Sequence, residues 1–273
     1  MNKYVQATIE VDNDEEREVL IAELIIVGFE SFEEDPKLLK AFVTDAAFDE
    51  SAFRSLIQQR GKKFKLEAIS EKNWNEEWER NFQPVVIGDF CAVRAAFHEP
   101  IVQTKHEIII TPKMSFGTGH HASTHLMLEL MGEEIFTNLT VLDFGTGTGI
   151  LSIMAEKLGA SAVLAIDIDE WSIENAAENL HMNNCRNTTL EKRGNIPLNA
   201  SFNRILANIN RNVILDSLPD MCKVLQVNGA ILLSGLLQSD FEQINVEATS
   251  LGLQLQRKGE KSGWIALRYN LLS

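Results

Sequence analysis

The residues best suited to bind a ligand and carry chemistry lie in a glycine-rich segment near the middle of the chain. Residues 141–149 read Val-Leu-Asp-Phe-Gly-Thr-Gly-Thr-Gly. This order predicts a buried strand, a loop without obstructing side chains and a helix N-terminus, where backbone N–H groups can approach a bound cofactor closely. A glycine turn that holds no ligand has a similar composition, so the flanking residues must decide between the two interpretations.

The flanks favour a sulfonium cofactor over a nicotinamide dinucleotide. The dinucleotide fingerprint is GxGxxG, and its third glycine position, counted from Gly145 and Gly147, is here Ile150. Asp143 stands beside the loop, where its charge would repel a pyrophosphate but suit the zwitterionic methionine end of S-adenosylmethionine. We therefore predict an S-adenosylmethionine site with Gly145 against the cofactor.

A second acidic position ends the next predicted strand. Asp167 lies 22 residues beyond Gly145, where a carboxylate can accept hydrogen bonds from both hydroxyls of a cofactor ribose. NAD and S-adenosylmethionine both carry such a ribose, so Asp167 alone fits either cofactor. Asp169 is predicted to cap the following helix or to lie in solvent.

An amide is predicted at the carboxyl end of a later strand. Ligands of open α/β sheets bind beyond these strand ends, so Asn208 should face the transferred methyl group. The alternative is a cap for the next helix. Ile209, Asn210 and Arg211 follow, without the Pro-Pro-aromatic clamp of methyltransferases that act on planar bases or amides. A flexible amine is therefore the predicted methyl acceptor.

A second glycine loop, residues 115–124, opens a helix predicted over residues 123–131. Its hydroxyls and backbone donors could hold the carboxylate of the cofactor. His120, His121 and His125 raise the possibility of a metal site, because positions 121 and 125 share a helical face. No nearby acidic or cysteine ligand completes such a site, and we predict no metal.

The elements around these residues predict a Rossmann-like α/β sheet. Strands and helices alternate from residue 139 onward, which is typical of a parallel sheet with helices on both faces. Two closing strands predict an antiparallel hairpin at one edge, as in many methyltransferases. Strands are predicted at residues 85–97, 107–111, 140–144, 162–166, 188–192, 204–207, 230–233, 253–257 and 264–269, and helices at 150–158, 170–183, 213–225 and 240–251.

The N-terminal part reads as a separate module. Residues 1–70 show the order strand, helix, strand, strand, helix, strand, which predicts a ferredoxin-like α+β domain without a catalytic cluster. Asn13 with Glu16, and Asp49, are predicted to cap its helices. Residues 71–84 are predicted to form a helical linker, and residues 85–273 the cofactor-binding domain.

Two tryptophans stand four residues apart in the predicted linker. The spacing of Trp74 and Trp78 places both on one helix face. Packing between domains and a stacking platform for a ligand are the two interpretations of this pair.

Composition narrows the functional class further. The 273 residues carry a formal net charge of −14, which argues against a basic nucleic-acid-binding surface and favours attraction of a basic protein or small cation. Plain solubility is the alternative reason for this charge. The three cysteines form no CxxC pair, and neither a signal peptide nor a membrane span is evident. These features predict a cytoplasmic protein without direct contact to nucleic acid or membrane.

The chain resembles the bacterial ribosomal protein L11 methyltransferases (PrmA) over essentially its whole length. The segments that carry this resemblance are Asn81-Phe82-Gln83-Pro84, Phe116-Gly117-Thr118-Gly119-His120, the loop after Asp143, Asp167-Ile168-Asp169 and Ala207-Asn208-Ile209. The resemblance implies S-adenosylmethionine-dependent methylation of amino groups of ribosomal protein L11, on lysine side chains, with the N-terminal amine as a further candidate. It also implies an N-terminal substrate-recognition domain.

Residue by residue, the resemblance implies cofactor contacts from Thr124, Gly145, Asp167 and Asn208. The chain departs from the family pattern at two places. Residues 121–124 read His-Ala-Ser-Thr where His-Pro-Thr-Thr is usual, and residues 210–211 read Asn-Arg where Leu-Ala is usual.

The predicted reaction is in-line methyl transfer to an uncharged amine. A lysine with an ordinary pKa near ~10.4 must lose its proton first, and burial favours that loss. Oxygens of Asn208 or of the nearby backbone would orient the amine, and the substrate would be a basic ribosomal protein before its assembly. Alternatives are methylation of another protein or small amine, a nicotinamide-dependent oxidoreductase, and a cofactor-binding module without activity.

Overall fold

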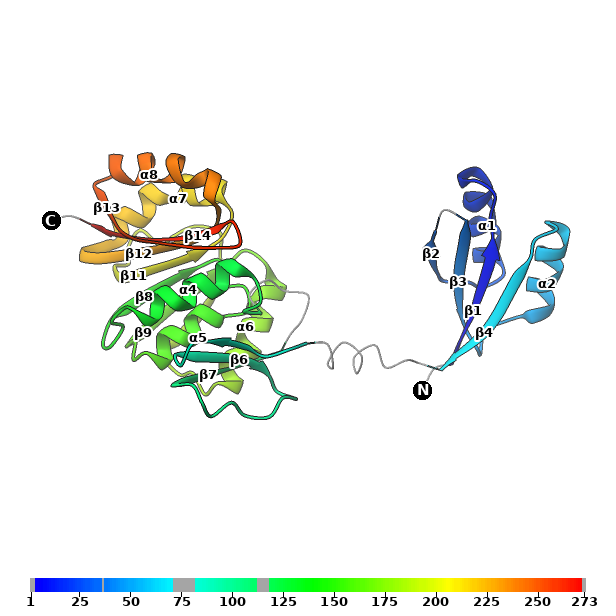
Figure 1. The fold of residues 1–273 in the computed structure, drawn as a ribbon, viewed down its shortest axis with the longest axis horizontal. Helices are drawn as coiled ribbons and strands as arrows, with labels where there is room; N and C mark the ends of the chain where they lie inside the picture. The colour runs from blue at the N-terminus through cyan, green and yellow to red at the C-terminus, as the bar shows by residue number, and fades with distance from the viewer. Residues whose placement is uncertain (1–2, 36, 71–81, 112–117, 272–273) are drawn as a thin grey trace. The chain divides into compact units, whose positions relative to one another are not determined.

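A computed structural model describes residues 3–35, 37–70, 82–111 and 118–271. The chain divides into two compact units, Met1–Phe82 and Gln83–Ser273 (Figure 1). The tryptophans of the predicted linker, Trp74 and Trp78, and residues 115–117 of the second glycine loop lie outside the described residues. Within the described residues, no helix has both the length and the apolarity that crossing a membrane requires.

The N-terminal unit is a four-stranded antiparallel sheet with two helices, in the strand order β2-β3-β1-β4. Its elements are β1 (Lys3–Glu10), α1 (Asp14–Ile26), β2 (Ser31–Glu34), β3 (Leu38–Thr44), α2 (Glu50–Gln59) and β4 (Phe64–Ser70). Alternate residues of β1 and β3 pack against both helices in one cluster drawn from residues 5–66. The predicted ferredoxin-like fold of this part is confirmed.

Both predicted helix caps of this unit are present. Asn13 Oδ1 accepts a hydrogen bond from Glu16 N at 2.9 Å, and the Glu16 carboxylate reaches back to Asp12 N at 2.8 Å. Asp49 Oδ1 accepts from two backbone N–H groups at the start of α2. Each cap satisfies N–H groups that a helix start leaves without an intrahelical partner.

Three short strands open the second unit. β5 (Val85–Ile87) pairs antiparallel with β6 (Cys91–Ala95), and β6 pairs parallel with β7 (His106–Ile110). The prediction of one continuous strand over residues 85–97 is therefore wrong. Gly88 has a φ of +52°, a left-handed conformation that glycine adopts without strain, and the chain turns back there.

The main sheet of the second unit has seven strands in the order β10-β9-β8-β11-β12-β14-β13. The first five are parallel, and β14 joins β12 and β13 in antiparallel pairing. The strands are β8 (Thr140–Phe144), β9 (Ala162–Asp167), β10 (Thr188–Lys192), β11 (Phe202–Asn208), β12 (Leu225–Leu237), β13 (Leu253–Lys261) and β14 (Trp264–Leu271). The predicted parallel sheet with a terminal edge hairpin is confirmed.

Helices cover both faces of this sheet. α7 (Arg211–Val224) and α8 (Phe241–Ser250) lie on one face, and α4 (Ala122–Gly132), α5 (Ile150–Lys157) and α6 (Glu170–Met182) on the other (Figure 1). Buried side chains of α7 and α8 pack with residues of the central strands in one apolar core. The carboxyl ends of β8, β9 and β11 are left facing the loops that carry the predicted site residues.

Candidate cofactor site and active site

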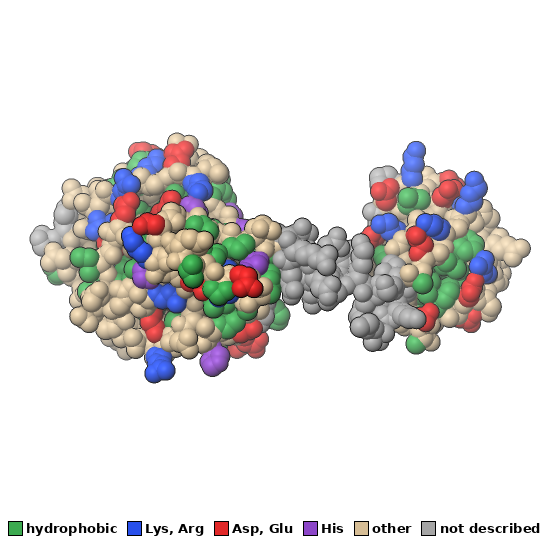
Figure 2. Space-filling view, turned by 60° about the horizontal axis from the view of Figure 1, so that its bottom comes forward, with side chains coloured by type: hydrophobic (Ala, Val, Ile, Leu, Met, Phe, Trp, Pro, Cys, Tyr) green, Lys and Arg blue, Asp and Glu red, His purple; other side chains and the backbone are tan. Residues whose placement is uncertain are grey.

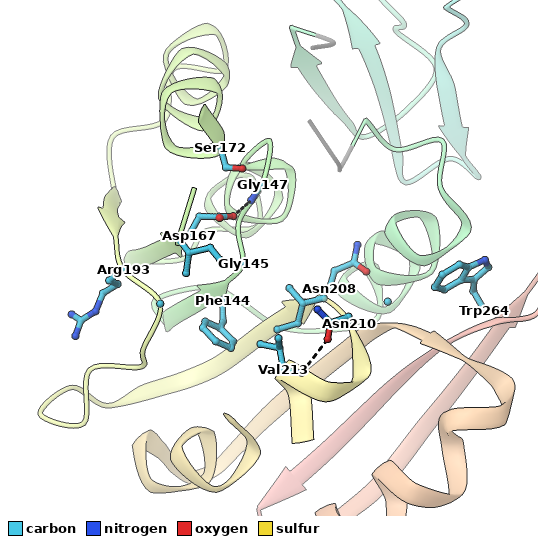
Figure 3. Close-up of a pocket in the computed structure, with 14 residues that line it drawn as sticks. Phe144, Gly145, Gly147, Asp167, Ser172, Arg193, Asn208, Asn210, Val213 and Trp264 are labelled. Carbon is cyan, nitrogen blue, oxygen red and sulfur yellow. Dashed lines mark hydrogen bonds between the residues drawn. The ribbon is translucent and has the colours of Figure 1, made fainter. Parts of the chain in front are cut away.

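A cavity of about 460 Å³ lies at the carboxyl ends of the central strands. Gly145, Asp167 and Asn208, which the sequence predicts as cofactor contacts, all line it. Figure 3 shows Asp167 and Gly145 on one side and Asn208 with Trp264 on the other. The volume falls within the range typical of small-molecule sites.

The glycine loop brings bare backbone to the cavity wall. Gly145 has a φ of +77°, and a Cβ atom there would lie 2.4 Å from Ile209 Cγ2. The N–H groups of Gly145 and Thr146 donate to Ile166 O at 2.9 and 3.0 Å, which fixes the loop on the neighbouring strand. A side chain at position 145 would therefore both strain the backbone and collide with the opposite wall.

Asp143, at the end of β8, holds the glycine loop through side-chain hydrogen bonds. Its side chain is fully buried, and Oδ2 accepts hydrogen bonds from Ser152 Oγ at 2.6 Å and Thr146 Oγ1 at 2.7 Å. Burial raises the pKa of the Asp143 carboxyl, against the lowering effect of these two hydroxyls. Asp143 is not among the residues that line the cavity, and its electrostatic effect on the methionine end of the cofactor stays a prediction.

Asp167 presents both carboxylate oxygens with acceptor capacity to spare. Oδ2 accepts from Gly147 N at 2.9 Å (Figure 3). Oδ1 accepts from Asp169 N at 3.1 Å. A carboxylate has about four lone-pair positions, so each oxygen retains one for a ligand hydroxyl. The Asp169 side chain caps α6 by accepting from Trp171 N at 3.1 Å, as predicted.

Asn208 is held by a residue 84 positions earlier in the chain. Asn208 Nδ2 donates to the hydroxyl of the fully buried Thr124 at 3.2 Å. The Asn208 Oδ1 atom is buried and has no hydrogen-bond partner among the described residues. Asn210, and not Asn208, caps the next helix, because Asn210 Oδ1 accepts from Val213 N at 3.1 Å. The competing interpretation of Asn208 as a helix cap is therefore excluded.

Thr124 lies behind Asn208 and outside the residues that line the cavity. Its hydroxyl accepts from the Asn208 amide and so directs the amide oxygen away from Thr124. The structure thus brings together all four predicted residues, three on the wall and one in support. A direct contact between Thr124 and the cofactor stays a prediction.

Several lining residues escaped the sequence analysis. Gly235 has a φ of +79°, and a Cβ atom there would lie 2.3 Å from Ile209 O. Trp264 and Arg193 also line the cavity, from the start of β14 and the segment after β10. Gly235 could have been predicted from the sequence, because it follows the apolar run at residues 230–233 and so stands near the end of a predicted strand. Nothing local distinguishes Trp264, since pairing of distant strands brings it there.

The histidines around the start of α4 have structural partners. His121 Nδ1 accepts from Ser123 N at 3.3 Å as the cap of α4, and its ring packs edge-on against Trp264 at 4.4 Å. His125 Nε2 lies 2.7 Å from Lys261 Nζ and 3.2 Å from a Glu129 oxygen. The described residues include no group of three or more His, Cys, Asp or Glu placed to hold a metal ion.

The surroundings of His125 predict a pH-dependent stability. Burial and the nearby Lys261 ammonium lower the pKa of His125, while Glu129 opposes them. In the unfolded chain His125 takes up a proton near pH 6.5, whereas in the folded protein it does so only at lower pH. The contribution of neutral His125 to the free energy of unfolding is therefore fully present above about pH 6.5 and is lost as the pH falls toward the pKa of the folded state. Burial also lowers the pKa of His106, which therefore acts in the same direction.

When the pH is lowered from about 7.5 to about 5.5, we expect the free energy of unfolding of His125→Gln to fall less than that of the unaltered protein. The glutamine removes the titration and retains an acceptor for Lys261. Chemical denaturation at both pH values measures the difference. An identical pH dependence in the two proteins would contradict the assignment to His125.

Comparison with known proteins gives matches over nearly the whole chain. A family model described as "Ribosomal protein L11 methyltransferase (PrmA)" matches residues 2–271. A ribosomal protein L11 methyltransferase of Phocaeicola vulgatus is 36% identical over 278 residues, covering 98% of this chain and 99% of the relative. Another, of Porphyromonas gingivalis, is 42% identical over 261 residues, covering 92% and 90%.

Solved structures agree with these matches. A ribosomal protein L11 methylase from Lactobacillus delbrueckii subsp. bulgaricus has a TM-score of 0.66 at 28% identity, covering 70% of this chain and 100% of that structure. A methyltransferase from Pyrococcus furiosus has a TM-score of 0.52 at 19% identity, covering 61% and 90%. The second likeness concerns the fold alone, which is that of the predicted Rossmann-like methyltransferase sheet.

Proposed function

The chain belongs to the ribosomal protein L11 methyltransferase family, and from this premise we propose that it methylates amino groups of ribosomal protein L11. S-adenosylmethionine is the methyl donor. Lysine side chains are the acceptors, and the N-terminal amine is a further candidate. The observation that carries this proposal is the meeting of Asp167 and Asn208 acceptors in one cavity beside the glycine loop.

The residues present fit this cofactor. Asp167 offers one free acceptor position on each oxygen, which matches the two hydroxyls of a ribose. Asn208 Oδ1, on the cavity wall, is a buried acceptor without a partner among the described residues. Buried acceptors of this kind are costly unless a donor meets them, and a donor-rich cationic ligand would meet such groups. Gly145 supplies the close backbone approach.

We infer the following division of labour during transfer. When bound, S-adenosylmethionine supplies an electrophilic methyl group on a cationic sulfur. Asn208 Oδ1, fixed by the amide contact to Thr124, orients the incoming amine from the opposite side of the cavity to Asp167. Half-buried Trp264 at the cavity wall excludes water around the amine and disfavours its ammonium form. Alignment of amine and methyl group then contributes much of the rate.

Recognition of the substrate is assigned to the N-terminal unit. We propose that residues 1–70 recognise L11 and that residues 85–273 hold the cofactor. Residues 71–84 would form the linker between these two domains. Residues 1–82 carry 19 acidic and 11 basic side chains, a balance that attracts a basic protein. On the face drawn in Figure 2, hydrophobic side chains of this unit gather among the charged ones. Such a mixed surface is typical of protein–protein contacts.

The remaining proposals follow from the nature of this substrate. Ribosome assembly covers part of the surface of a ribosomal protein, so we propose that the reaction takes place before assembly and in the cytoplasm. Contact is with the protein substrate and not directly with nucleic acid or membrane.

The test uses purified protein, purified unmodified L11 and methyl-labelled S-adenosylmethionine. Mass spectrometry should find L11 peptides heavier by whole methyl groups at lysine or at the N-terminus. Labelling of a different protein in a cell extract, with L11 unlabelled, would redirect the proposal to another substrate. Binding of S-adenosylmethionine without transfer to any protein would leave a cofactor-binding module.

Removal of Asp167 is expected to weaken cofactor binding selectively. Asp167→Ala should cost about 1.5–3 kcal/mol of S-adenosylmethionine affinity, the range for hydrogen bonds to a charged group. Titration calorimetry measures it, with thermal melting as a check on folding. Asp169→Ala is the matched control, because that carboxylate caps α6 and should cost stability but little affinity. Equal affinities of Asp167→Ala and the unaltered protein would remove Asp167 from the site.

A further inference from the structure

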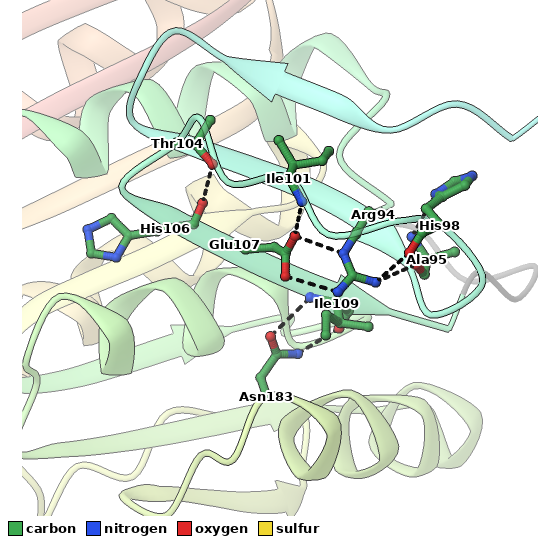
Figure 4. Close-up of polar contacts among 9 residues, drawn as sticks. All are labelled: Arg94, Ala95, His98, Ile101, Thr104, His106, Glu107, Ile109 and Asn183. Carbon is green, nitrogen blue, oxygen red and sulfur yellow. Dashed lines mark hydrogen bonds and ion pairs between the residues drawn. The ribbon is translucent and has the colours of Figure 1, made fainter.

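One edge of the strand β7 is closed by side-chain amides instead of a neighbouring strand. β7 pairs with β6 on one side only in the described three-stranded sheet. On that side the Arg94 guanidinium also donates to both Glu107 oxygens at 2.8 and 3.0 Å (Figure 4). The opposite edge faces α6, where backbone N–H and C=O groups need partners if they are to be buried.

Asn183 pairs with this edge as a strand would. Ile109 N donates to Asn183 Oδ1 at 3.0 Å, and Asn183 Nδ2 donates to Ile109 O at 2.6 Å (Figure 4). The amide thus reproduces the paired bonds of a sheet ladder. Asn183 holds β7 against the end of α6, and its hydrogen bonds within the described residues do not reach the glycine loop.

Asn179, one helical turn earlier, extends the same pairing and adds a second connection. Thr111 N donates to Asn179 Oδ1 at 2.8 Å, while Asn179 Nδ2 donates to Thr148 O at 2.8 Å. Thr148 belongs to the glycine loop that lines the cofactor cavity. The Asn179 side chain is fully buried, so each of these bonds is costly to leave unmade.

The contact between α6 and the loop is close at the neighbouring turn as well. A Cβ atom at Gly149 would lie 3.2 Å from Ala176 Cβ. A shift of α6 is therefore felt by the loop both through this packing and through the Asn179 amide. The loop position in turn decides where Gly147 N meets Asp167.

We propose that Asn179 is a positioning residue that joins the edge of β7 to the glycine loop and thereby sets the affinity for S-adenosylmethionine. This inference rests on the proposed function, in that the cavity must bind this cofactor. Asn179 acts through Thr148 and does not line the cavity itself. Asn183, with the same side chain at the C-cap of the same helix, closes the same strand edge without reaching the loop.

The matched pair Asn179→Asp and Asn183→Asp tests this role. Each change keeps the acceptor for β7 and replaces a buried amide donor by a carboxylate that repels a carbonyl oxygen. At about pH 8, Asn179→Asp should bind S-adenosylmethionine about tenfold more weakly than the unaltered protein, and Asn183→Asp within about threefold of it. Calorimetry gives the affinities, and thermal melting should show similar losses of stability in both variants.

Lowering the pH provides a rescue that is specific to position 179. Once protonated, the carboxyl group introduced there can again donate to Thr148 O. Relative to the unaltered protein, the affinity of Asn179→Asp should recover as the pH falls, while that of Asn183→Asp should stay level. Equal loss in both variants without such a recovery would overturn the proposal. Failure of the unaltered protein to bind would instead overturn the proposed function.

A measurement on the unaltered protein covers the case in which Asn179→Asp does not fold. Because coupling is reciprocal, S-adenosylmethionine bound at the loop should strengthen the bond at the far end of Asn179. Saturation should slow hydrogen exchange of Thr111 N–H at least about threefold more than that of Ile109 N–H, its internal control. Equal slowing of the two amides would refute the coupling through Asn179.

Discussion

A truncated protein that begins at Gln83 should bind S-adenosylmethionine with nearly unchanged affinity and methylate dilute L11 about 10²-fold more slowly than the full chain. The cofactor cavity draws its described lining from residues 144–264. Removal of the unit proposed to recognise L11 should abolish the tethering that raises the effective concentration of substrate to millimolar order for short connections. Transfer kinetics across a range of L11 concentrations measure the effect.

The defect should shrink as L11 approaches millimolar concentration. A short lysine peptide serves as the control, because it is too small to use the recognition unit and should be modified equally by both proteins. Full-length rates of the truncated protein on dilute L11 would show that residues 1–82 do not recognise the substrate.

Asn208→Ala should lower turnover about 10²-fold while weakening cofactor binding much less. In the proposed mechanism the amide oxygen orients the amine, and misplacement of a reacting group by about 1 Å costs on this order. An interaction strongest in the transition state lowers turnover more than ground-state affinity. Single-turnover transfer and calorimetry on the same samples separate the two quantities.

Two substitutions of Thr124, the buried neighbour of Asn208, test the same role with smaller expected effects. Thr124→Val removes the hydroxyl that accepts from Asn208 Nδ2, whereas Thr124→Ser retains a hydroxyl there. We expect an intermediate loss of turnover, about tenfold, in the valine variant and a smaller one in the serine variant. Equal losses of turnover and affinity in Asn208→Ala would reduce Asn208 to a cofactor contact.

Local sequence signals sufficed for most elements. The predicted strands at residues 140–144 and 188–192 match β8 and β10 at both ends, and Asn13, Asp49 and Asp169 cap their helices as expected. Apolar runs bounded by glycine, and polar caps, are local properties that folding preserves. The largest error in the length of an element concerns β12, which was predicted over four residues and extends from Leu225 to Leu237. Its extra length depends on pairing with distant strands.

The site was predictable only where it lies next to a strand end. Gly145, Asp167 and Asn208 directly follow or end strands of a sheet whose ligand-binding edge is known in advance. The contact of Thr124 with Asn208 and the place of Trp264 depend on tertiary packing that the spacing of residues does not reveal. Asn179 reads in the sequence as one polar helix residue among several. Its role follows only from the meeting of α6, β7 and the glycine loop.

The self-contained core of the N-terminal unit has an evolutionary consequence. Every member of its apolar cluster comes from residues 5–66, and the predicted chemistry lies elsewhere in the chain. Substitutions on the exposed face of this unit can therefore follow changes in a partner protein without disturbing the geometry of methyl transfer. Divergence among homologues should consequently run faster there than around the glycine loop. Under the proposed division of labour, exchange of this unit between family members should alter substrate choice.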